Sequence, residues 1–347
     1  MFDVNDTNYY VIAAILIISF SYFANKWKQS FEDNNDEYHI IRKYLLNDSP
    51  LYGYNRPKLW IHTKYEINAR RWKDFSSRNT TDLNEPYIHY TIKTIIDHCG
   101  DDFNICLIDD QSFSKLLPSW DINLTDIAEP MKQDFRELAM LELIYYYGGM
   151  IIPNSFLCMK NLISFYENGV LGNRPFVCES INRSVDNFRN KHKLLFLPNL
   201  YIMGAIKNDP VILELVEYLK KRNRSHHFTS EIEFLGDSDQ WCVSAINNQK
   251  MNLVGGELVG VKSNDRKPIL LEDLMEEDYL NFHKDLVGIF IPNDEILKRP
   301  KFQWFAVLPI QNILASKIII AKYFAAALAD NVDEYSKKTE MRSVVAI

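Results

Sequence analysis

The central part of the chain alternates between short apolar runs and segments with one apolar face. Uninterrupted apolar runs at 58–62 and 104–108 predict two buried strands. Between them, isoleucines recur at helical spacing after a Glu-Pro pair, which predicts a helix from Pro86 to Cys99. A strand, a helix and a second strand in this order are typical of a βαβ unit within a parallel sheet.

The rest of the chain continues the same alternation. A nearly apolar stretch after Glu137 predicts a buried helix over 131–147 that ends at Gly148 and Gly149. We expect further strands at 150–152, 156–158, 175–178 and 201–205, and helices at 210–221 and 311–330. The pattern therefore predicts an α/β fold with a mostly parallel sheet covered by helices, in one domain over residues 57–330. A flexible tail is expected at 331–347.

Residues 9–24 form an uncharged, mostly apolar run of 16 residues with aromatic residues near both ends. Because a spanning helix needs about 17–25 apolar residues, we expect one N-terminal transmembrane helix within residues 1–28. Lys26 and Lys28 follow the run and no Lys or Arg precedes it, which predicts a single-pass protein with its globular domain in the cytosol. Residues 29–56 then form a juxtamembrane linker and helix. A buried core helix is the alternative for the run.

Composition excludes several classes of function. The 347 residues carry 39 basic and 46 acidic side chains, a net charge of −7, which argues against a nucleic-acid partner. The five cysteines form no CxxC pair, which argues against a disulfide framework or a structural zinc site. Neither GxGxxG nor GxxxxGK[ST] occurs, so the common phosphate-binding loops are missing.

Polar residues follow the predicted strands at the edge where parallel sheets bind ligands. His62 ends the first strand, and it can face this edge or be a satisfied core histidine. Asp109 and Asp110 follow the second strand, where they can accept hydrogen bonds from the ribose or base of a nucleotide. Their alternative is a helix cap or a solvated loop. Asn154 and Ser155 can bind a sugar or phosphate, or form only a Pro-Asn-Ser turn.

Three further acids are candidates for acid–base chemistry. Glu137 can orient a sugar hydroxyl, or it can be a helix-start carboxylate favoured by the helix dipole. Asp237 and Asp239 fall in a predicted polar loop, where one of them can act as a catalytic base or as a ligand. Acidic residues are also common in solvated loops, which is the plain alternative for both.

One block of the chain resembles a family. Residues 137–162 combine an apolar helix, the motif Tyr-x-Tyr-Gly-Gly at 145–149, a strand, and Lys-x-Leu at 160–162. The block resembles the nucleotide-sugar glycosyltransferases with a GT-A fold, of the DXD-sugar-binding and capsular-polysaccharide-synthesis type. Weaker similarities extend over residues 57–322. The resemblance implies a GT-A-like sheet and a hexosyltransferase reaction from a nucleotide-sugar donor to a glycan or protein acceptor.

The chain departs from this family at its metal motif. Pro153 and Ser155 stand where the family has two aspartates, which hold Mn²⁺ or Mg²⁺ on the donor diphosphate. The sequence therefore assigns no metal ligand and no certain cofactor. Mn²⁺ or Mg²⁺ stays possible, although the usual aspartate ligands are absent. The family's helix arginine corresponds to Met140, although Arg136 lies one turn earlier.

Two functions follow from these observations. The sequence favours a membrane-anchored glycosyltransferase-like protein that transfers a sugar from a nucleotide-sugar donor. The alternative is a catalytically inactive relative that binds glycans or acts as a scaffold at a membrane, motivated by the loss of the paired aspartates.

Overall fold

The computed structural model describes residues 56–63, 85–118, 120–128, 131–181, 196–224 and 237–329. The apolar run at 9–24, the linker helix and the tail lie outside these ranges. Among the described residues, no helix combines the length and the apolar character that crossing a membrane requires.

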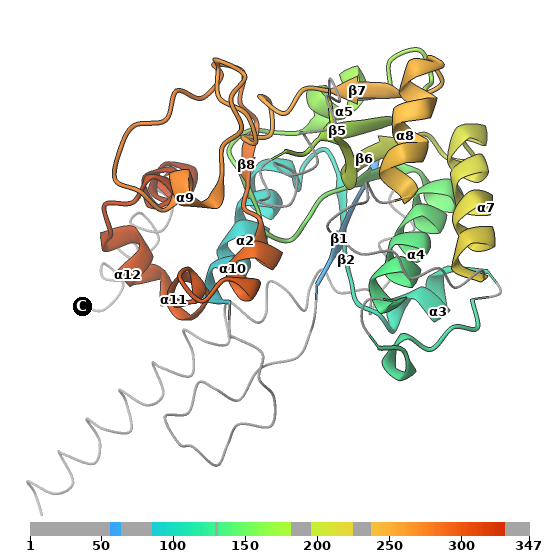
Figure 1. Ribbon diagram of the computed structural model, residues 1–347, viewed down its shortest axis with the longest axis horizontal. Helices are drawn as coiled ribbons and strands as arrows, with labels where there is room; N and C mark the ends of the chain where they lie inside the picture. Colours follow the sequence, from blue (N-terminus) through green and yellow to red (C-terminus); the bar gives the residue numbers. More distant parts are fainter. Residues whose placement is uncertain are drawn as a thin grey trace, which may run out of the picture. The chain divides into compact units, whose positions relative to one another are not determined.

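A six-stranded sheet in the order β2-β1-β3-β6-β5-β7 forms the centre (Figure 1). β1 pairs in parallel with β2 and β3, and β5 pairs in parallel with β7. β6 is antiparallel to both β3 and β5, so five of these strands point one way and β6 opposes them. This arrangement confirms a mixed α/β fold with a mostly parallel sheet. The strands are β1 (Lys58–His62), β2 (Asn104–Ile108), β3 (Gly149–Ile151), β5 (Phe176–Glu179), β6 (Pro198–Ala205) and β7 (Asn252–Val254).

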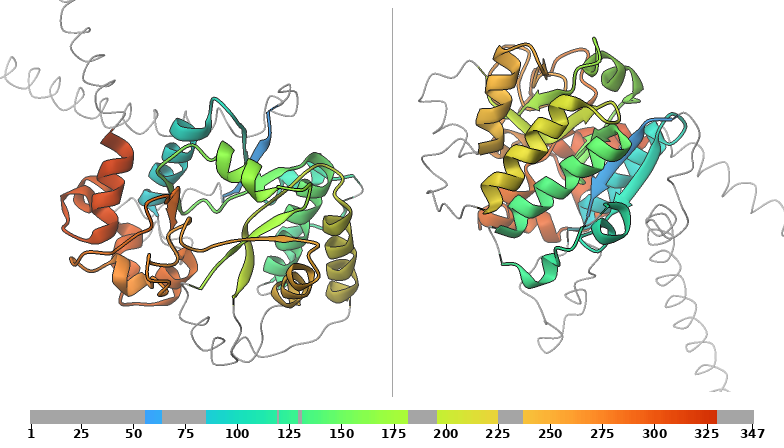
Figure 2. Two further views of the ribbon diagram at one scale, coloured as in Figure 1. Left: turned by 90° about the horizontal axis from the view of Figure 1, so that it is seen from above. Right: turned by 90° about the vertical axis from the view of Figure 1, so that its right-hand side faces the viewer.

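Helices cover the sheet. The predicted helix α2 (Pro86–Cys99) lies between β1 and β2 in sequence, which confirms the first βαβ unit. α4 (Met131–Tyr147), α7 (Pro210–Arg224) and α8 (Asp237–Asn247) pack side by side, as the right view of Figure 2 shows. An ion pair joins α4 and α7: the buried carboxylate of Glu142 lies 2.5 Å from the ammonium group of Lys220.

A separate two-stranded sheet accompanies the six-stranded one. Here β4 (Phe156–Cys158) pairs antiparallel with β8 (Gly288–Phe290), and α2 packs on β4. Short helices complete the described part of the chain: α3 (Ser112–Leu116), η4 (Leu124–Asp126), α5 (Ile163–Gly169), α9 (Leu271–Leu274), α10 (Asn293–Lys298), α11 (Gln303–Val307) and α12 (Ile310–Ala315).

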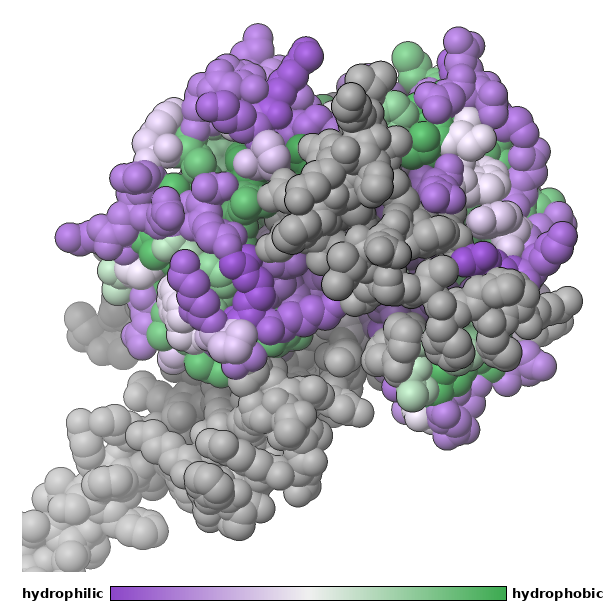
Figure 3. Space-filling model, viewed as in Figure 1, coloured by the Kyte–Doolittle hydropathy of each residue, from purple (hydrophilic) through white to green (hydrophobic). Residues whose placement is uncertain are grey.

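The core explains why the strands read as continuous apolar runs. Leu59, Trp60 and Ile61 of β1 are fully buried, as expected for a strand covered on both faces. Ile92 and Ile95 of α2 are buried as well, which accounts for the helical spacing of the isoleucines. Hydrophilic residues predominate on the described surface that Figure 3 shows.

The C-terminal helix prediction is wrong in one respect. A single helix was expected over 311–330, but α12 ends at Ala315 and a separate helical segment covers 319–329. Ser316 donates its hydroxyl back to the carbonyl of Ile313 at 2.6 Å, which offers the backbone an alternative to continuing the helix.

Candidate functional site

The carboxyl ends of β1, β2 and β3 meet at one edge of the sheet. His62 pairs in register with Ile108, so the aspartates after Ile108 lie next to the end of β1. On the other side of β1, Ile152 donates its N–H to the carbonyl of Trp60 at 3.0 Å. The segment 153–155 therefore leaves the sheet at the same edge, where ligands bind in open α/β sheets.

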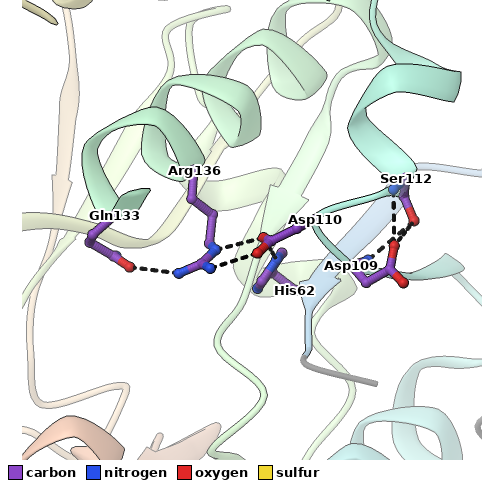
Figure 4. Close-up of polar contacts among 6 residues, drawn as sticks. All are labelled: His62, Asp109, Asp110, Ser112, Gln133 and Arg136. Atoms are coloured by element: carbon purple, nitrogen blue, oxygen red, sulfur yellow. Dashed lines mark hydrogen bonds and ion pairs between the residues drawn. The ribbon is translucent and has the colours of Figure 1, made fainter. Parts of the chain in front are cut away.

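Asp110 is the centre of a compact polar cluster (Figure 4). Arg136 of α4 grips its carboxylate with two nitrogens, Nε to Oδ1 and Nη2 to Oδ2, both at 2.8 Å. His62 Nε2 lies 2.8 Å from Oδ1, and Gln133 accepts a 3.1 Å hydrogen bond from Nη1 of Arg136. Burial alone would raise the pKa of Asp110, but the hydrogen bonds from Arg136 and His62 outweigh it and lower that pKa well below its usual range. Asp110 is therefore an anion paired with a fixed cation.

Within the described ranges the ring of His62 is hydrogen-bonded through Nε2, and its other nitrogen is the candidate contact for a ligand. Burial lowers the pKa of His62, and the hydrogen bond that the ring donates to Asp110 offsets this only in part, so the ring is neutral near neutral pH. An ionised carboxylate can only accept, so Nε2 carries the proton that points to Asp110. Nδ1 is left as an acceptor. The ring stacks on Phe113 with centroids 5.8 Å apart, which fixes its orientation.

Asp109 has a structural contact of its own. Its Oδ1 accepts hydrogen bonds from the backbone N–H and the hydroxyl of Ser112, at 2.9 and 2.6 Å, at the start of α3 (Figure 4). This is the helix-start geometry that the sequence left open as an alternative. A ribose contact by Asp109 stays a prediction, and Asp110 is the aspartate that joins His62.

Glu137 faces away from this cluster. Successive helical residues point about 100° apart, so Arg136 can reach β2 while its neighbour Glu137 contacts Ser238 of α8. Although part of the Glu137 side chain reaches solvent, the surrounding protein removes most water from its carboxyl group. This desolvation raises the pKa of Glu137 to about 7, partly offset by the hydrogen bond from Ser238 and increased by the charge of Asp134.

The predicted loop that contains Asp237 and Asp239 is a helix. α8 begins at Asp237, so the loop prediction is wrong; acidic residues favour the first turn of a helix because of its dipole. Asp239 is buried. The pKa of the nearby Cys242 thiol is raised well above its usual value, mainly by the burial of Cys242 and further by the charges of Asp239 and Glu137. The structure thus brings Glu137 and Asp239 to one place beside Cys242, separate from the contacts of Asp110.

The segment that replaces the metal motif is used for packing. Ser155 is buried and donates its hydroxyl to the carbonyl of Ile291 at 2.7 Å, so this oxygen is turned inward. The backbone carbonyl of Asn154 accepts a 2.5 Å hydrogen bond from Thr91, and its side chain is half-buried. Among the described residues, no three His, Cys, Asp or Glu side chains are grouped so that they could hold a metal ion. Residues 153–155 therefore do not fit the cation that the family resemblance implies.

The Tyr-x-Tyr-Gly-Gly motif has a clear mechanical role. Gly148 and Gly149 have φ of 69° and 100°, in the region that favours glycine. A Cβ at Gly149 would lie 2.1 Å from the carbonyl oxygen of Lys58, so only glycine lets β3 start against β1. The hydroxyl of Tyr147 donates to the carbonyl of Leu116 at 2.6 Å, which ties the end of α4 to α3. The motif thus fixes the frame that carries the site.

Comparisons with known proteins add little to this geometry. No protein-family model and no curated protein matches the chain. One solved structure that it matches is titled "PaToxG Glycosyltransferase"; the identity is 14%, the match covers 63% of this chain and 81% of that one, and the TM-score is 0.33. A likeness at this level carries no argument about activity.

Proposed function

We propose that this chain is a glycosyltransferase-like protein of the GT-A type that binds a nucleotide sugar at the carboxyl edge of β1, β2 and β3. The observation that carries the proposal is the cluster of His62, Asp110 and Arg136 at that edge. Carboxylate and imidazole acceptors suit the hydroxyls and base of a nucleoside, and a guanidinium suits its diphosphate.

Arg136 supplies the positive charge that the missing cation would have supplied. A guanidinium binds carboxylates and phosphates in the same two-pronged geometry. A donor diphosphate can therefore replace Asp110 as the partner of Arg136, which stabilises the leaving group and frees Asp110 to accept from ribose hydroxyls. Asp109 and Asn154, which flank this edge, are the supporting donor-binding candidates. Ser155 supports them from the core side.

Glu137 stays an acid–base candidate because of its raised pKa, although its side chain contacts α8 and not the cluster around Asp110. A carboxyl group with a pKa of about 7 is close to half ionised at neutral pH, which suits removal of a proton from an acceptor hydroxyl. Asp239, buried nearby at the start of α8, is the second candidate. Asp237 precedes it by two residues and stays a candidate on sequence alone.

A panel of UDP- and GDP-sugars tests the proposal. Binding to the full chain is measured by calorimetry, and nucleotide release by chromatography, each with Mn²⁺ and with EDTA. We expect binding in EDTA that falls at least about tenfold in Asp110→Ala and in Arg136→Met, since each loses a charge-assisted contact. Asp285→Asn, at a side chain that is 64% exposed beside His283, is the control and should bind normally. Absence of binding and release across the panel would overturn the proposal.

A catalytically inactive relative is the second candidate. The specific observation in its favour is that Arg136 and Asp110 already satisfy each other, while Ser155 is committed to Ile291. The same panel separates the two functions, because the inactive relative would bind a sugar or glycan without releasing nucleotide. Restoring aspartate at 155 is a poor test, since it would bury a carboxylate against a carbonyl oxygen.

Membrane attachment belongs to the proposal and rests on the sequence alone. The uncharged run at 9–24, followed by Lys26 and Lys28, would anchor the chain with its globular domain in the cytosol. In cell fractions the full chain should resist alkaline carbonate extraction, and a variant lacking residues 9–24 should not. Release of both would contradict the anchor.

A further inference from the structure

Cys99 and Cys158 place two thiol groups side by side in the core, although 59 residues separate them in the sequence. Cys99 is the last residue of α2 and Cys158 is the last residue of β4, and these two elements pack against each other. The two Sγ atoms lie 3.9 Å apart, and both residues are fully buried. A disulfide holds its sulfurs at about 2.05 Å, so each sulfur has to move by only about 1 Å to form one.

Hydrogen bonds on both sides of the thiols hold α2 and the chain around β4 together. Before the pair, the backbone N–H of Cys158 donates to the hydroxyl of Thr94 at 3.1 Å. After it, Asn161 donates its side-chain N–H to the carboxylate of Asp102 at 2.6 Å. The backbone therefore already keeps the two cysteines next to each other, and rotation of their side chains brings the sulfurs together.

The two thiols differ in how readily they react. A hydrogen bond from Cys158 lowers the pKa of Cys99, against the effect of burial, which raises it. Burial raises the pKa of Cys158, as it does for Cys178 and Cys242 and, to about 12, for Cys106. The thiolate is the form of cysteine that attacks an oxidant. Among the five cysteines, all of which the structure describes, Cys99 is therefore the one that should react first, with Cys158 beside it to complete a bond.

We propose that Cys99 and Cys158 are a redox pair, which a small two-electron oxidant such as hydrogen peroxide converts into a disulfide. The Cys99 thiolate attacks one peroxide oxygen and the O–O bond breaks; the hydroxide takes up the thiol proton and leaves as water, and Cys99 becomes a sulfenic acid. The sulfur of Cys158 then attacks the sulfur of Cys99, the S–O bond breaks, and a second water leaves with the proton of Cys158. Two thiols and one peroxide give one disulfide and two waters, and a thiol reductant reverses the bond.

The bond would lock α2 to the segment that leads from the candidate site into β4. Thr91 of α2 donates to the carbonyl of Asn154 at 2.5 Å, at the start of this segment. A disulfide at Cys158 would fix its other end, so that Asn154 and Ser155 are held to α2 more firmly in the oxidised chain. A reducing compartment keeps such a pair as thiols, so the lock would form only under oxidising conditions.

Peptide mapping of the folded full chain tests the pair. The chain is treated with hydrogen peroxide, catalase removes the excess, and N-ethylmaleimide blocks the remaining thiols in denaturant. We expect a peptide that links Cys99 to Cys158 and disappears on reduction, with the cysteines outside the pair alkylated. Absence of the linked peptide, or links spread over the other cysteines, would overturn the proposal.

Single variants separate the roles of the two thiols. Cys158→Ser keeps a hydroxyl donor beside Cys99 but lacks the second thiol, so Cys99 should stop at the sulfenic acid, which dimedone traps. Cys99→Ser should give neither the link nor a dimedone adduct at Cys158, and an adduct there would contradict the order of the two steps. Cys178→Ser, at another buried thiol, is the matched control and should form the link as the wild type does. Thermal unfolding checks that each variant folds, and the wild-type map decides the pairing if one does not.

The oxidised and reduced forms of the wild type test the lock. Closing a loop of about 60 residues restricts the unfolded chain, so the Tm of the oxidised form should be higher by about 5 °C or more. The backbone N–H of Cys158 should also exchange with solvent deuterium at least about tenfold more slowly. An oxidised form that unfolds at a lower temperature than the reduced one would refute the lock. None of these measurements involves a nucleotide, so they stand or fall separately from the proposed function.

Discussion

The pairing of Arg136 with Asp110 should contribute a large, measurable coupling energy. Two hydrogen bonds of 2.8 Å join side chains that are 12% and 25% exposed. Hydrogen bonds to charged groups contribute about 1.5–3 kcal/mol each, and partial exposure reduces this, so we expect a coupling of about 2–3 kcal/mol. A double-mutant cycle of Arg136→Met and Asp110→Ala, read by urea unfolding at pH 7, measures it.

A surface pair provides the control for this cycle. Lys250 and Glu214 lie 2.7 Å apart but are 49% and 53% exposed, so their coupling should stay below about 1 kcal/mol. If the Arg136–Asp110 coupling is no larger than that of the surface pair, the interpretation of the cluster is refuted.

The coupling should also depend on pH in a defined direction. The pKa of Asp110 is lowered in the folded state, because the hydrogen bonds from Arg136 and His62 outweigh the opposing effect of burial. Its contribution to stability is therefore complete above the unfolded pKa of about 3.9 and is lost as the pH falls through the lower folded pKa. The destabilisation by Arg136→Met should be equal at pH 7 and 5 and should shrink below about pH 4. A penalty that persists unchanged in acid would contradict the assignment.

Three further predictions follow from the structure. Because the pKa of Glu137 is raised, its ionisation destabilises the fold as the pH rises from about 4.5 to 7. The free energy of unfolding of Glu137→Gln, measured in urea, should therefore increase relative to that of the wild type by up to about 2–3 kcal/mol between pH 5 and pH 8. A difference that does not change with pH would refute this. Gly149→Ala should unfold at least about 3 kcal/mol more easily, whereas Gly172→Ala, at a φ of 75° with only a 3.4 Å contact, should lose about 1 kcal/mol; equal losses in calorimetric melting would contradict the clash with Lys58. All five cysteines are buried and free, so a thiol reagent should label none in the native protein and five after denaturation; native labelling would contradict their burial.

The sequence predicted those strands and helices whose burial shows directly in the spacing of their apolar residues. β1, α2 and β2 were predictable because apolar runs and the isoleucine spacing report burial directly. β7 was not predicted, because its three residues are only half-buried and carry no strand pattern. The split of the C-terminal helix at Ser316 depends on a side-chain contact that spacing does not show.

The candidate site was predictable in its location but not in its contacts. The edge position of His62, Asp109 and Asp110 follows from the strand ends. The choice of Asp110 as the partner of Arg136 depends on how α4 is placed over β2, across 26 residues of sequence. The inward turn of Ser155 likewise depends on Ile291, which directly follows β8 and lies 136 residues away.

The position of a bound nucleotide tests the central claim most directly. A crystal structure of the full chain with UDP or GDP in EDTA should show the nucleoside within hydrogen-bonding distance of Asp110 or His62, and the diphosphate on Arg136. A nucleotide bound away from these three residues, or bound only through a metal ion held elsewhere, would contradict the account.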